Sequence, residues 1–368
     1  PAPLSVRILS DLAGLTVDLP EPFTKPAAER IALVSRLDFL PGQEGIENRG
    51  SLGDDIRWLL RFAAEDGVWD FDRGELRLGS ATPAMPGVRG LHIVGSTPEV
   101  RFADWLALGR NREDRFGLAE RVRSVELSID SLYIIGQRLD NHTVEVDRSA
   151  RDWVVQVDGT EVVGSLLVPY QFGDDRPIVL DMERLVLPGD DTASGQTDGA
   201  DIDPRLLPPV SLTAREFAIG NRHFGNVVAE FEKTSEGLYT SNVVATDPTF
   251  EIIGTAGWVA KETDPRGSES YVTVTLASSD VVETMRRLDY SLGIESDDMR
   301  ILLDLAWSGG PRLDFLESLN GEVQVRLGSG QLVEVEPGAG RVFGLMSIVA
   351  LPRRLSLDFR DVFDKGFG

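Results

Sequence analysis

Three histidines are the side chains in this sequence best suited to acid–base or metal chemistry. They are His92, His142 and His223. A zinc site or a general base needs partners, such as an H-E-x-x-H motif or nearby cysteines, and the sequence contains neither. A hydrolase would require the fold to bring His92 or His142 to a carboxylate and a hydroxyl. We expect surface or strand-edge histidines instead, with no metal site and no catalytic residue.

An acidic segment, residues 189–201, offers oxygen ligands of the kind that calcium prefers. Its spacing lacks the alternating ligands, central glycine and terminal glutamate of an EF-hand loop. The low complexity of the segment favours a solvated loop or linker over a calcium site. The carboxylates concerned are Asp190, Asp191, Asp198, Asp201 and, just beyond, Asp203.

Two basic or glycine-rich features near the C-terminus could bind phosphate. Residues 337–341 read Pro-Gly-Ala-Gly-Arg, but they lack the Gly-Lys-Ser/Thr ending of a phosphate-binding loop, so we expect a turn and no cofactor. Arg353 and Arg354 could meet a lipid phosphate or a partner's carboxylates. The alternative, which we favour, is that they pair with Asp358 and Asp361.

The elements that would position such residues are strands, because apolar and polar side chains alternate with a period of two. The segments that show this are 125–130, 227–232, 271–276, 301–305 and 322–327. Each is predicted to be a strand with one dry face and one wet face. The dry face would carry Val125, Leu127, Ile129, Val227, Phe231, Val272, Val274, Leu276, Leu303, Val323 and Val325.

Turn signals such as Asp158-Gly159 and Asn320-Gly321 separate the strands and predict a mostly antiparallel meander. Short helices are predicted to open at Ser96-Thr97-Pro98 and at Ser279-Asp280. Weak internal similarity indicates repeated β units that stack into an extended protein. We divide the chain at these signals into residues 1–110, 111–205, 206–290 and 291–368. Alternation alone leaves open whether the sheet forms a trough or a closed sandwich.

The composition limits the classes of partner. The chain has 368 residues, 42% of them hydrophobic, and a formal net charge of −23. Nucleic acid is excluded as a partner, and direct docking on an anionic bilayer is disfavoured, because both need clustered cations. The longest apolar run, Val342–Leu351, has about half the ~20 residues needed to span a membrane. It is predicted to be core or a plug at the end of the sheet, with partial insertion into a membrane as the alternative.

A long motif near the C-terminus resembles the signature of YhdP-type AsmA-like proteins. Two segments upstream also resemble this family: residues 19–26, which read Leu-Pro-Glu-Pro-Phe-Thr-Lys-Pro, and Trp307-Ser308-Gly309, in which Ser308 replaces the usual proline. The residues of the long motif are Pro337, Gly338, Gly340, Arg341, Gly344, Leu351, Pro352, Arg353, Arg354, Asp358 and Phe359.

The resemblance implies an elongated, twisted antiparallel β-groove with a few short helices, similar to bridge-like lipid-transfer proteins. The implied function is movement of phospholipid between inner and outer membranes, which supports the outer-membrane permeability barrier. The chain would be the C-terminal periplasmic part of a protein anchored to the inner membrane by an N-terminal segment outside it. We expect strands to continue beyond both ends. Envelope proteins are further possible partners, and a scaffolding β-repeat protein without lipid is the alternative.

Overall fold

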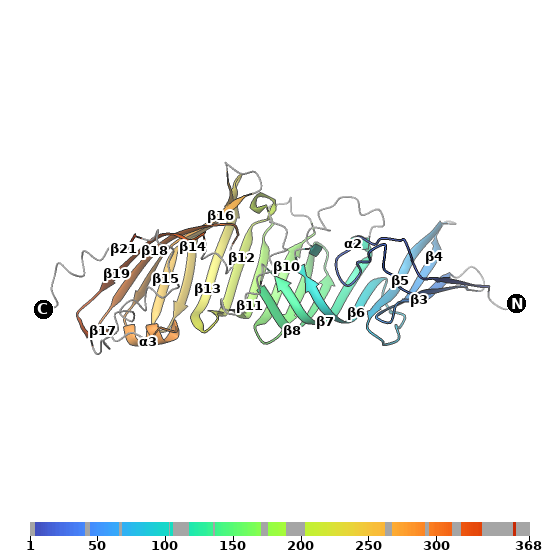
Figure 1. Ribbon diagram of the computed structural model, residues 1–368, viewed down its shortest axis with the longest axis horizontal. Helices are drawn as coiled ribbons and strands as arrows, with labels where there is room; N and C mark the ends of the chain where they lie inside the picture. The colour runs from blue at the N-terminus through green and yellow to red at the C-terminus, as the bar shows by residue number, and fades with distance from the viewer. Residues whose placement is uncertain are drawn as a thin grey trace. The chain divides into compact units, whose positions relative to one another are not determined.

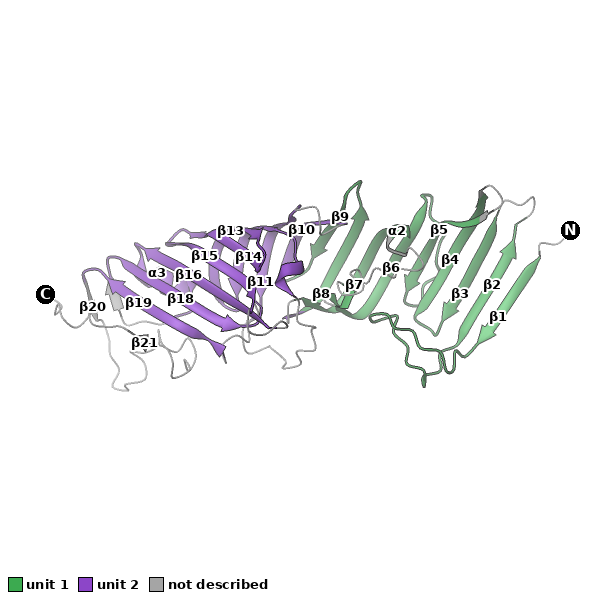
Figure 2. Ribbon diagram, turned by 90° about the horizontal axis from the view of Figure 1, so that it is seen from above, with its two compact units in different colours: residues 1–134, 139–160 green, residues 135–138, 161–368 purple. Residues whose placement is uncertain are grey.

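The computed structural model describes two compact units, which Figure 2 shows in different colours. Unit 1 comprises Pro1–Ile134 and Leu139–Thr160, and unit 2 comprises Ile135–Arg138 and Glu161–Gly368. Both consist mainly of β-strands, which confirms the predicted fold class. The division into four parts stays a prediction. The described residues are 4–40, 45–65, 68–102, 104–105, 118–134, 137–170, 176–188, 203–261, 267–290, 294–310, 318–332 and 356–357.

The sheet of unit 1 begins with antiparallel neighbours in chain order, from β1 to β5. The next two pairs, β5–β6 and β6–β7, are parallel, and β8–β9 is antiparallel again. Figure 1 shows the strands of this unit lying side by side, with the short helix α2 (Leu118–Arg121) leading into β7. The strands are β1 (Ser5–Ser10), β2 (Leu33–Phe39), β3 (Ile46–Leu52), β4 (Ile56–Glu65), β5 (Val68–Leu78), β6 (Gly90–Arg101), β7 (Val122–Ile134), β8 (Gln137–Arg148) and β9 (Asp152–Asp158).

The sheet of unit 2 is antiparallel except at β11–β12 and β19–β21. No pairing among the described strands joins β19 back to β10, so the sheet of this unit is not closed. Its strands are β10 (Val162–Pro169), β11 (Ile178–Leu187), β12 (Val210–Ile219), β13 (Arg222–Lys233), β14 (Gly237–Asp247), β15 (Phe250–Ala260), β16 (Ser268–Ser278), β18 (Met299–Ser308), β19 (Asn320–Leu327) and β21 (Ser356–Leu357), beside a separate pair of β17 (Ile294–Ser296) and β20 (Gly330–Leu332).

All five segments predicted from alternation are strands. They lie within β7, β13, β16, β18 and β19. The prediction of a mostly antiparallel sheet is also confirmed. The parallel pairs were not predicted, because a change of strand direction depends on the path of the connecting segment and leaves no mark on the period-two pattern.

One of the two predicted helices is confirmed and the start of the other is wrong. Helix α3 (Val281–Arg287) begins after Asp280, whose side chain accepts a hydrogen bond from the Glu283 amide at 3.1 Å. Ser96, Thr97 and Pro98 instead lie in β6, and helical residues begin at Phe102. Strand β5 pairs with β6 only as far as Gly95, so Pro98 removes no hydrogen bond on that side.

Helical structure is otherwise sparse. The 3-10 turn η3 (Pro204–Leu206) is capped by Asp203, and the other four predicted loop carboxylates lie outside the described residues. None of the helices in the described ranges is long and apolar enough to cross a membrane.

Candidate functional site

Two rows of apolar residues cross nine neighbouring strands of unit 2. Successive members of each row are directly opposite one another, so they share one face of the sheet. The first row is Gly164, Met182, Ala214, Val227, Ala245, Ile252, Leu276, Ile301 and Val325. The second is Leu166, Leu180, Leu212, Ala229, Val243, Gly254, Val274, Leu303 and Val323. We call the surface that contains both rows the apolar face of unit 2.

Neither row contains a polar side chain, whereas the opposite face of the same strands mixes polar residues with apolar ones such as Val244 and Leu302. One row of that face crosses β15, β16, β18 and β19 as Thr255, Thr273, Asp304 and Glu322. A single sheet with this distribution has one side suited to water and one suited to hydrocarbon.

Glycines within the apolar rows allow neighbouring strands to approach closely. A Cβ added at Gly254 would lie 2.1 Å from the Thr273 carbonyl oxygen and 2.6 Å from the Val274 Cα. Both distances are too short for any side chain, so only glycine fits between β15 and β16 at this point. The other members of the same row are leucine, valine and one alanine.

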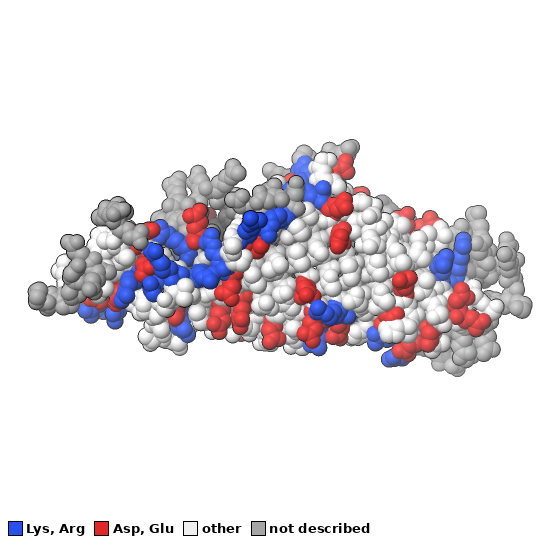
Figure 3. Space-filling model, turned by 180° about the vertical axis from the view of Figure 1, so that it is seen from behind, with Lys and Arg blue, Asp and Glu red and all other residues white. Residues whose placement is uncertain are grey.

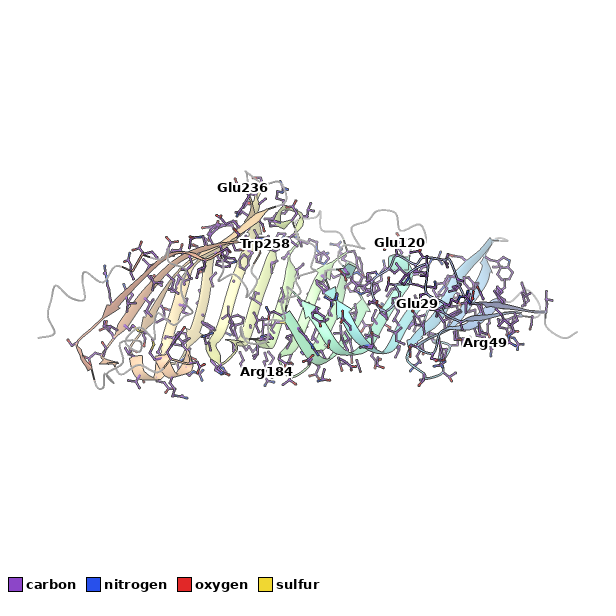
Figure 4. All side chains as sticks on the ribbon, viewed as in Figure 1. Glu29, Arg49, Glu120, Arg184, Glu236 and Trp258 are labelled. Atoms are coloured by element: carbon purple, nitrogen blue, oxygen red, sulfur yellow. The ribbon has the colours of Figure 1, made fainter. Side chains whose placement is uncertain are left out.

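The apolar face of unit 2 continues toward one end of its strands as a row with aromatic members. Trp258, labelled in Figure 4, is directly opposite Leu238 and Ser270, and Ser270 is opposite Trp307. The Trp307 indole N–H donates to the Gly310 carbonyl at 2.9 Å, and the Ser270 hydroxyl donates to Gly309 at 2.8 Å. The family-like Trp-Ser-Gly segment therefore anchors a large side chain at this end of the face.

Helix α3 packs on the other end of the apolar face, as its position beside the ends of β13 and β15 in Figure 1 shows. Val281, Met285 and Leu288 form a buried cluster with side chains of the sheet. Those sheet residues are Phe250, Leu276, Met299 and Ile301. The helix therefore covers the first row where it crosses β16 and β18.

A buried ion pair fastens α3 to the sheet. Arg287 donates to the Asp247 carboxylate at 2.5 and 3.0 Å, and the side chain of Asp247 is fully buried. The Thr249 amide and hydroxyl also donate to Asp247, at 3.1 and 3.0 Å. Burial by itself raises the pKa of Asp247, but these hydrogen bonds outweigh it and hold that pKa below its ordinary value.

Unit 1 has an apolar face of its own, built in the same way. One row crosses seven strands as Ser10, Leu33, Leu52, Ile56, Leu78, Gly95 and Leu127. The next is Ile8, Ser35, Gly50, Trp58, Leu76, Ile93 and Val125. Most members are aliphatic, and Trp58 fills the space that Gly50 leaves, since a Cβ there would be 2.3 Å from the indole.

Polar side chains on the apolar face of unit 1 form hydrogen bonds with one another. Asn48 donates to the Ser35 hydroxyl at 2.7 Å and accepts from the Trp58 indole N–H at 2.6 Å. Its amide also donates to the Arg36 carbonyl at 3.3 Å. Ser35 and Asn48 were not predicted from the sequence. The signal was available, because Ser35 and Asn48 occupy inward positions of alternating segments that are otherwise apolar.

Every residue predicted for the dry face lies on the apolar face of its unit. Val125, Leu127 and Ile129 lie on that of unit 1, where Ile129 is opposite Thr97. The remaining eight lie on that of unit 2, with Phe231 opposite Val210. A role of these residues in contacting a ligand stays a prediction. The eight are Val227, Phe231, Val272, Val274, Leu276, Leu303, Val323 and Val325.

The histidines are not brought together with a cluster of metal ligands. Among the described residues, no group of three or more His, Cys, Asp or Glu side chains could hold a metal ion. The His92 ring lies 2.8 Å from the Ser124 hydroxyl on the polar face of unit 1. The expectation of a surface position is wrong for His142, which is only 1% exposed. Gly159 leaves room for the ring, because a Cβ at that position would lie 2.2 Å from it.

Of the segments that resemble the family, the N-terminal one lies within the described residues and the long C-terminal motif lies almost wholly outside them. Lys25 is buried, and its ammonium group donates to the Leu15 and Pro26 carbonyls at 2.9 and 3.0 Å. Phe23 packs edge-on against Trp105 with ring centroids 5.9 Å apart. The long C-terminal motif from Pro337 to Phe359, with Arg353 and Arg354, lies outside the described residues apart from β21. The Val342–Leu351 run also lies outside them.

Comparison with known proteins identifies relatives over the full length of the chain. The family model described as YhdP protein matches residues 2–368. The intermembrane phospholipid transporter YhdP of Escherichia coli (strain K12) is 24% identical over 385 residues, which cover 100% of this chain. The chain spans 29% of that relative's length. No solved structure matches. Because the family model matches almost every residue, this chain belongs to the YhdP protein family.

Proposed function

We propose that this chain is a lipid-handling segment of a transporter that moves phospholipid between inner and outer membranes. The observation that carries the proposal is the pair of rows in unit 2, which cross nine strands without a polar side chain. The name of the E. coli relative, an intermembrane phospholipid transporter, supports the choice of ligand.

The apolar rows can bind an acyl chain through hydrophobic burial alone. Each methylene group removed from water gains about 0.8 kcal/mol, so an acyl chain lying along the rows where α3 does not cover them is held without any specific contact. Strands spaced about 4.8 Å apart give the nine-strand row a length of about 40 Å, which exceeds that of one acyl chain. Successive positions are chemically alike, so a lipid moves along the row by exchanging equivalent contacts. No catalytic step is needed.

The finer assignment follows from the same proposal. The apolar face of each unit forms a groove for acyl chains, while the head group remains in water. The segment works in the periplasm, in a protein anchored to the inner membrane through a part that lies outside this chain. Its action supports the permeability barrier of the outer membrane, and envelope proteins are further partners.

Site-specific photo-crosslinking of lipid in the expressed chain tests the proposal. The strands provide matched pairs of neighbours: Leu303 and Val243 lie on the apolar face, whereas Leu302 and Val244 point to the opposite face. A photoreactive amino acid at Leu303 or Val243 should capture phospholipid, identified by mass spectrometry, and one at Leu302 or Val244 should not. Equal capture within both pairs would show that lipid has no preference for the apolar face, and no lipid at any of the four positions would show a scaffold that binds none; either result contradicts the proposal.

A further inference from the structure

The face of unit 1 opposite its apolar face is unusually basic for so acidic a chain. Figure 3 shows Lys and Arg side chains gathered over the N-terminal strands on this side. Strands β1 to β5 contribute seven arginines to the face and no lysine, and Arg49 among them is labelled in Figure 4. We call this surface the arginine face; its arginines are Arg7, Arg36, Arg49, Arg57, Arg61, Arg73 and Arg77.

The register places these arginines directly opposite one another. Arg36 lies between Arg7 on β1 and Arg49 on β3. Arg57 is opposite Arg77, and Arg61 is opposite Arg73, on β4 and β5. Like charges at directly opposite positions destabilise a sheet, so four such pairs within five strands are unfavourable for folding. The concentration of four opposed pairs on five neighbouring strands, rather than any single pair, points to a role in binding.

Nearby carboxylates neutralise only part of the charge. Asp38 is shared by Arg36 at 2.8 Å and Arg49 at 3.6 Å. Glu47 is likewise shared by Arg61 at 2.5 Å and Arg49 at 3.7 Å. Arg77 pairs with Glu75 and Arg73 with Asp72, at 2.6 and 2.8 Å.

Two arginines of the face, Arg7 and Arg57, have no ion pair within the described part of the chain. The side chains of Arg36 and Arg49 are 54% and 57% exposed, so their guanidinium groups are open to a ligand. The exclusive use of arginine is informative because a planar guanidinium binds carboxylate or phosphate through two parallel hydrogen bonds, which lysine cannot do.

We propose that the arginine face is the docking surface for an acidic segment of a partner polypeptide. Charge complementarity requires an anionic partner, and the chain's formal charge of −23 favours a short one. An extended anionic membrane would repel the acidic remainder of the molecule, whereas a short segment contacts the arginines alone. Leu9 is the one exposed large apolar side chain among the described residues of this face, so membrane insertion has little support.

The dimensions of the surface fit such a segment. Five strands about 4.8 Å apart span roughly 20 Å, which matches about six residues of extended polypeptide at ~3.4 Å each. A segment with several Asp or Glu residues over that length can meet the opposed arginine pairs in turn. Binding would relieve the repulsion between the arginines.

A fluorescein-labelled peptide of fifteen glutamates provides a probe for the 368-residue chain. Fluorescence anisotropy in about 50 mM salt should show binding that weakens steeply with added salt, because the contacts are ionic. Arg36→Glu with Arg49→Glu should weaken binding by about tenfold or more. Arg7→Glu alone should weaken it by about threefold, and because Arg7 has no described ion pair this variant keeps the fold of the sheet.

The matched control is Arg300→Glu with Arg326→Glu, a directly opposed and exposed arginine pair on the polar face of unit 2. It should leave binding unchanged within about twofold. Equal weakening by both double variants, or no binding of the peptide, overturns the proposal. Vesicles containing phosphatidylglycerol form a third arm: if they bind through Arg36 and Arg49 while the peptide does not, the partner is a lipid surface and the proposal is wrong.

Discussion

At the scale of single residues, the apolar face of unit 1 accommodates polar side chains by pairing them completely. Asn48 uses its carbonyl oxygen and both amide hydrogens, on Trp58, Ser35 and the Arg36 carbonyl. A buried polar group costs little when it is hydrogen-bonded and much when it is not. The network therefore holds the Trp58 indole in one orientation across the face, over the space that Gly50 leaves.

Replacing Asn48 with leucine tests this account. Asn48→Leu removes the acceptor of the Trp58 N–H and the donor to Ser35, so we expect the free energy of unfolding to fall by about 1–3 kcal/mol. The measurement is urea unfolding followed by tryptophan fluorescence. The control is Ser51→Ala on the other face of β3, where a change within about 0.5 kcal/mol is expected. A leucine variant as stable as the original chain would show that the network contributes nothing.

At the scale of elements, α3 is held to the sheet of unit 2 by both apolar packing and charge. Its apolar residues Val281, Met285 and Leu288 join the buried cluster, while Arg287 reaches the buried Asp247. The start of this helix was predictable, because Asp280 is a local capping signal. The ion pair was not, because Asp247 and Arg287 are 40 residues apart in the chain.

The lowered pKa of Asp247 makes the attachment of α3 sensitive to acid. The folded pKa lies below the ordinary unfolded value of about 3.9, so the stabilisation is fully present above about pH 4 and is lost as the pH falls through the folded pKa. The protection of the α3 amides against hydrogen exchange, measured relative to the intrinsic exchange rate at each pH, should therefore fall below about pH 4. Asp247→Asn should remove this dependence and, at neutral pH, cost about 2 kcal/mol.

The matched control for this prediction is Glu283→Gln. Glu283 pairs with Arg286 on the exposed side of the same helix, and its pKa is also lowered, chiefly by the hydrogen bond from Arg286. An exposed pair contributes little to stability, so no measurable change in α3 exchange at neutral pH is expected. If Glu283→Gln and Asp247→Asn have the same effect, the buried pair has no special part in holding the helix.

At the scale of the whole molecule, two units each carry an apolar face and a polar face. The proposal of lipid handling applies to both, because each face is large and mostly aliphatic. The polar faces differ: that of unit 1 is the arginine face, whereas that of unit 2 mixes threonine with charges of both signs.

Lipid capture in both units is the corresponding prediction. A photo-crosslinker at Leu76 in unit 1 and one at Val274 in unit 2 should each capture phospholipid. Ile93→Asp, directly opposite Leu76, should lower capture at Leu76 by about tenfold, since a charge on the face repels hydrocarbon, and leave capture at Val274 unchanged. Val94→Asp on the opposite face is the control and should change neither. Capture confined to one unit would restrict lipid handling to that unit.

The sequence by itself determined the five alternating strands, their two faces and the family. A period of two is a local property, so Val125, Val274 and Leu303 could be placed on a dry face from their immediate neighbours alone. Their place on the apolar face of their own unit then required only that the strands pair in a regular sheet. The buried His142 and the strand conformation of Ser96–Pro98 were missed, because each depends on what neighbouring strands leave open.

Only the tertiary structure decided which polar residues meet. The seven arginines of the arginine face are scattered between positions 7 and 77, and their direct opposition depends on the register of three strand pairs. A shift of one residue in any pair would separate them. Register is set by contacts between strands that are distant along the chain, and no local pattern records it. For that reason the apolar faces could be predicted from the sequence, and the arginine face could not.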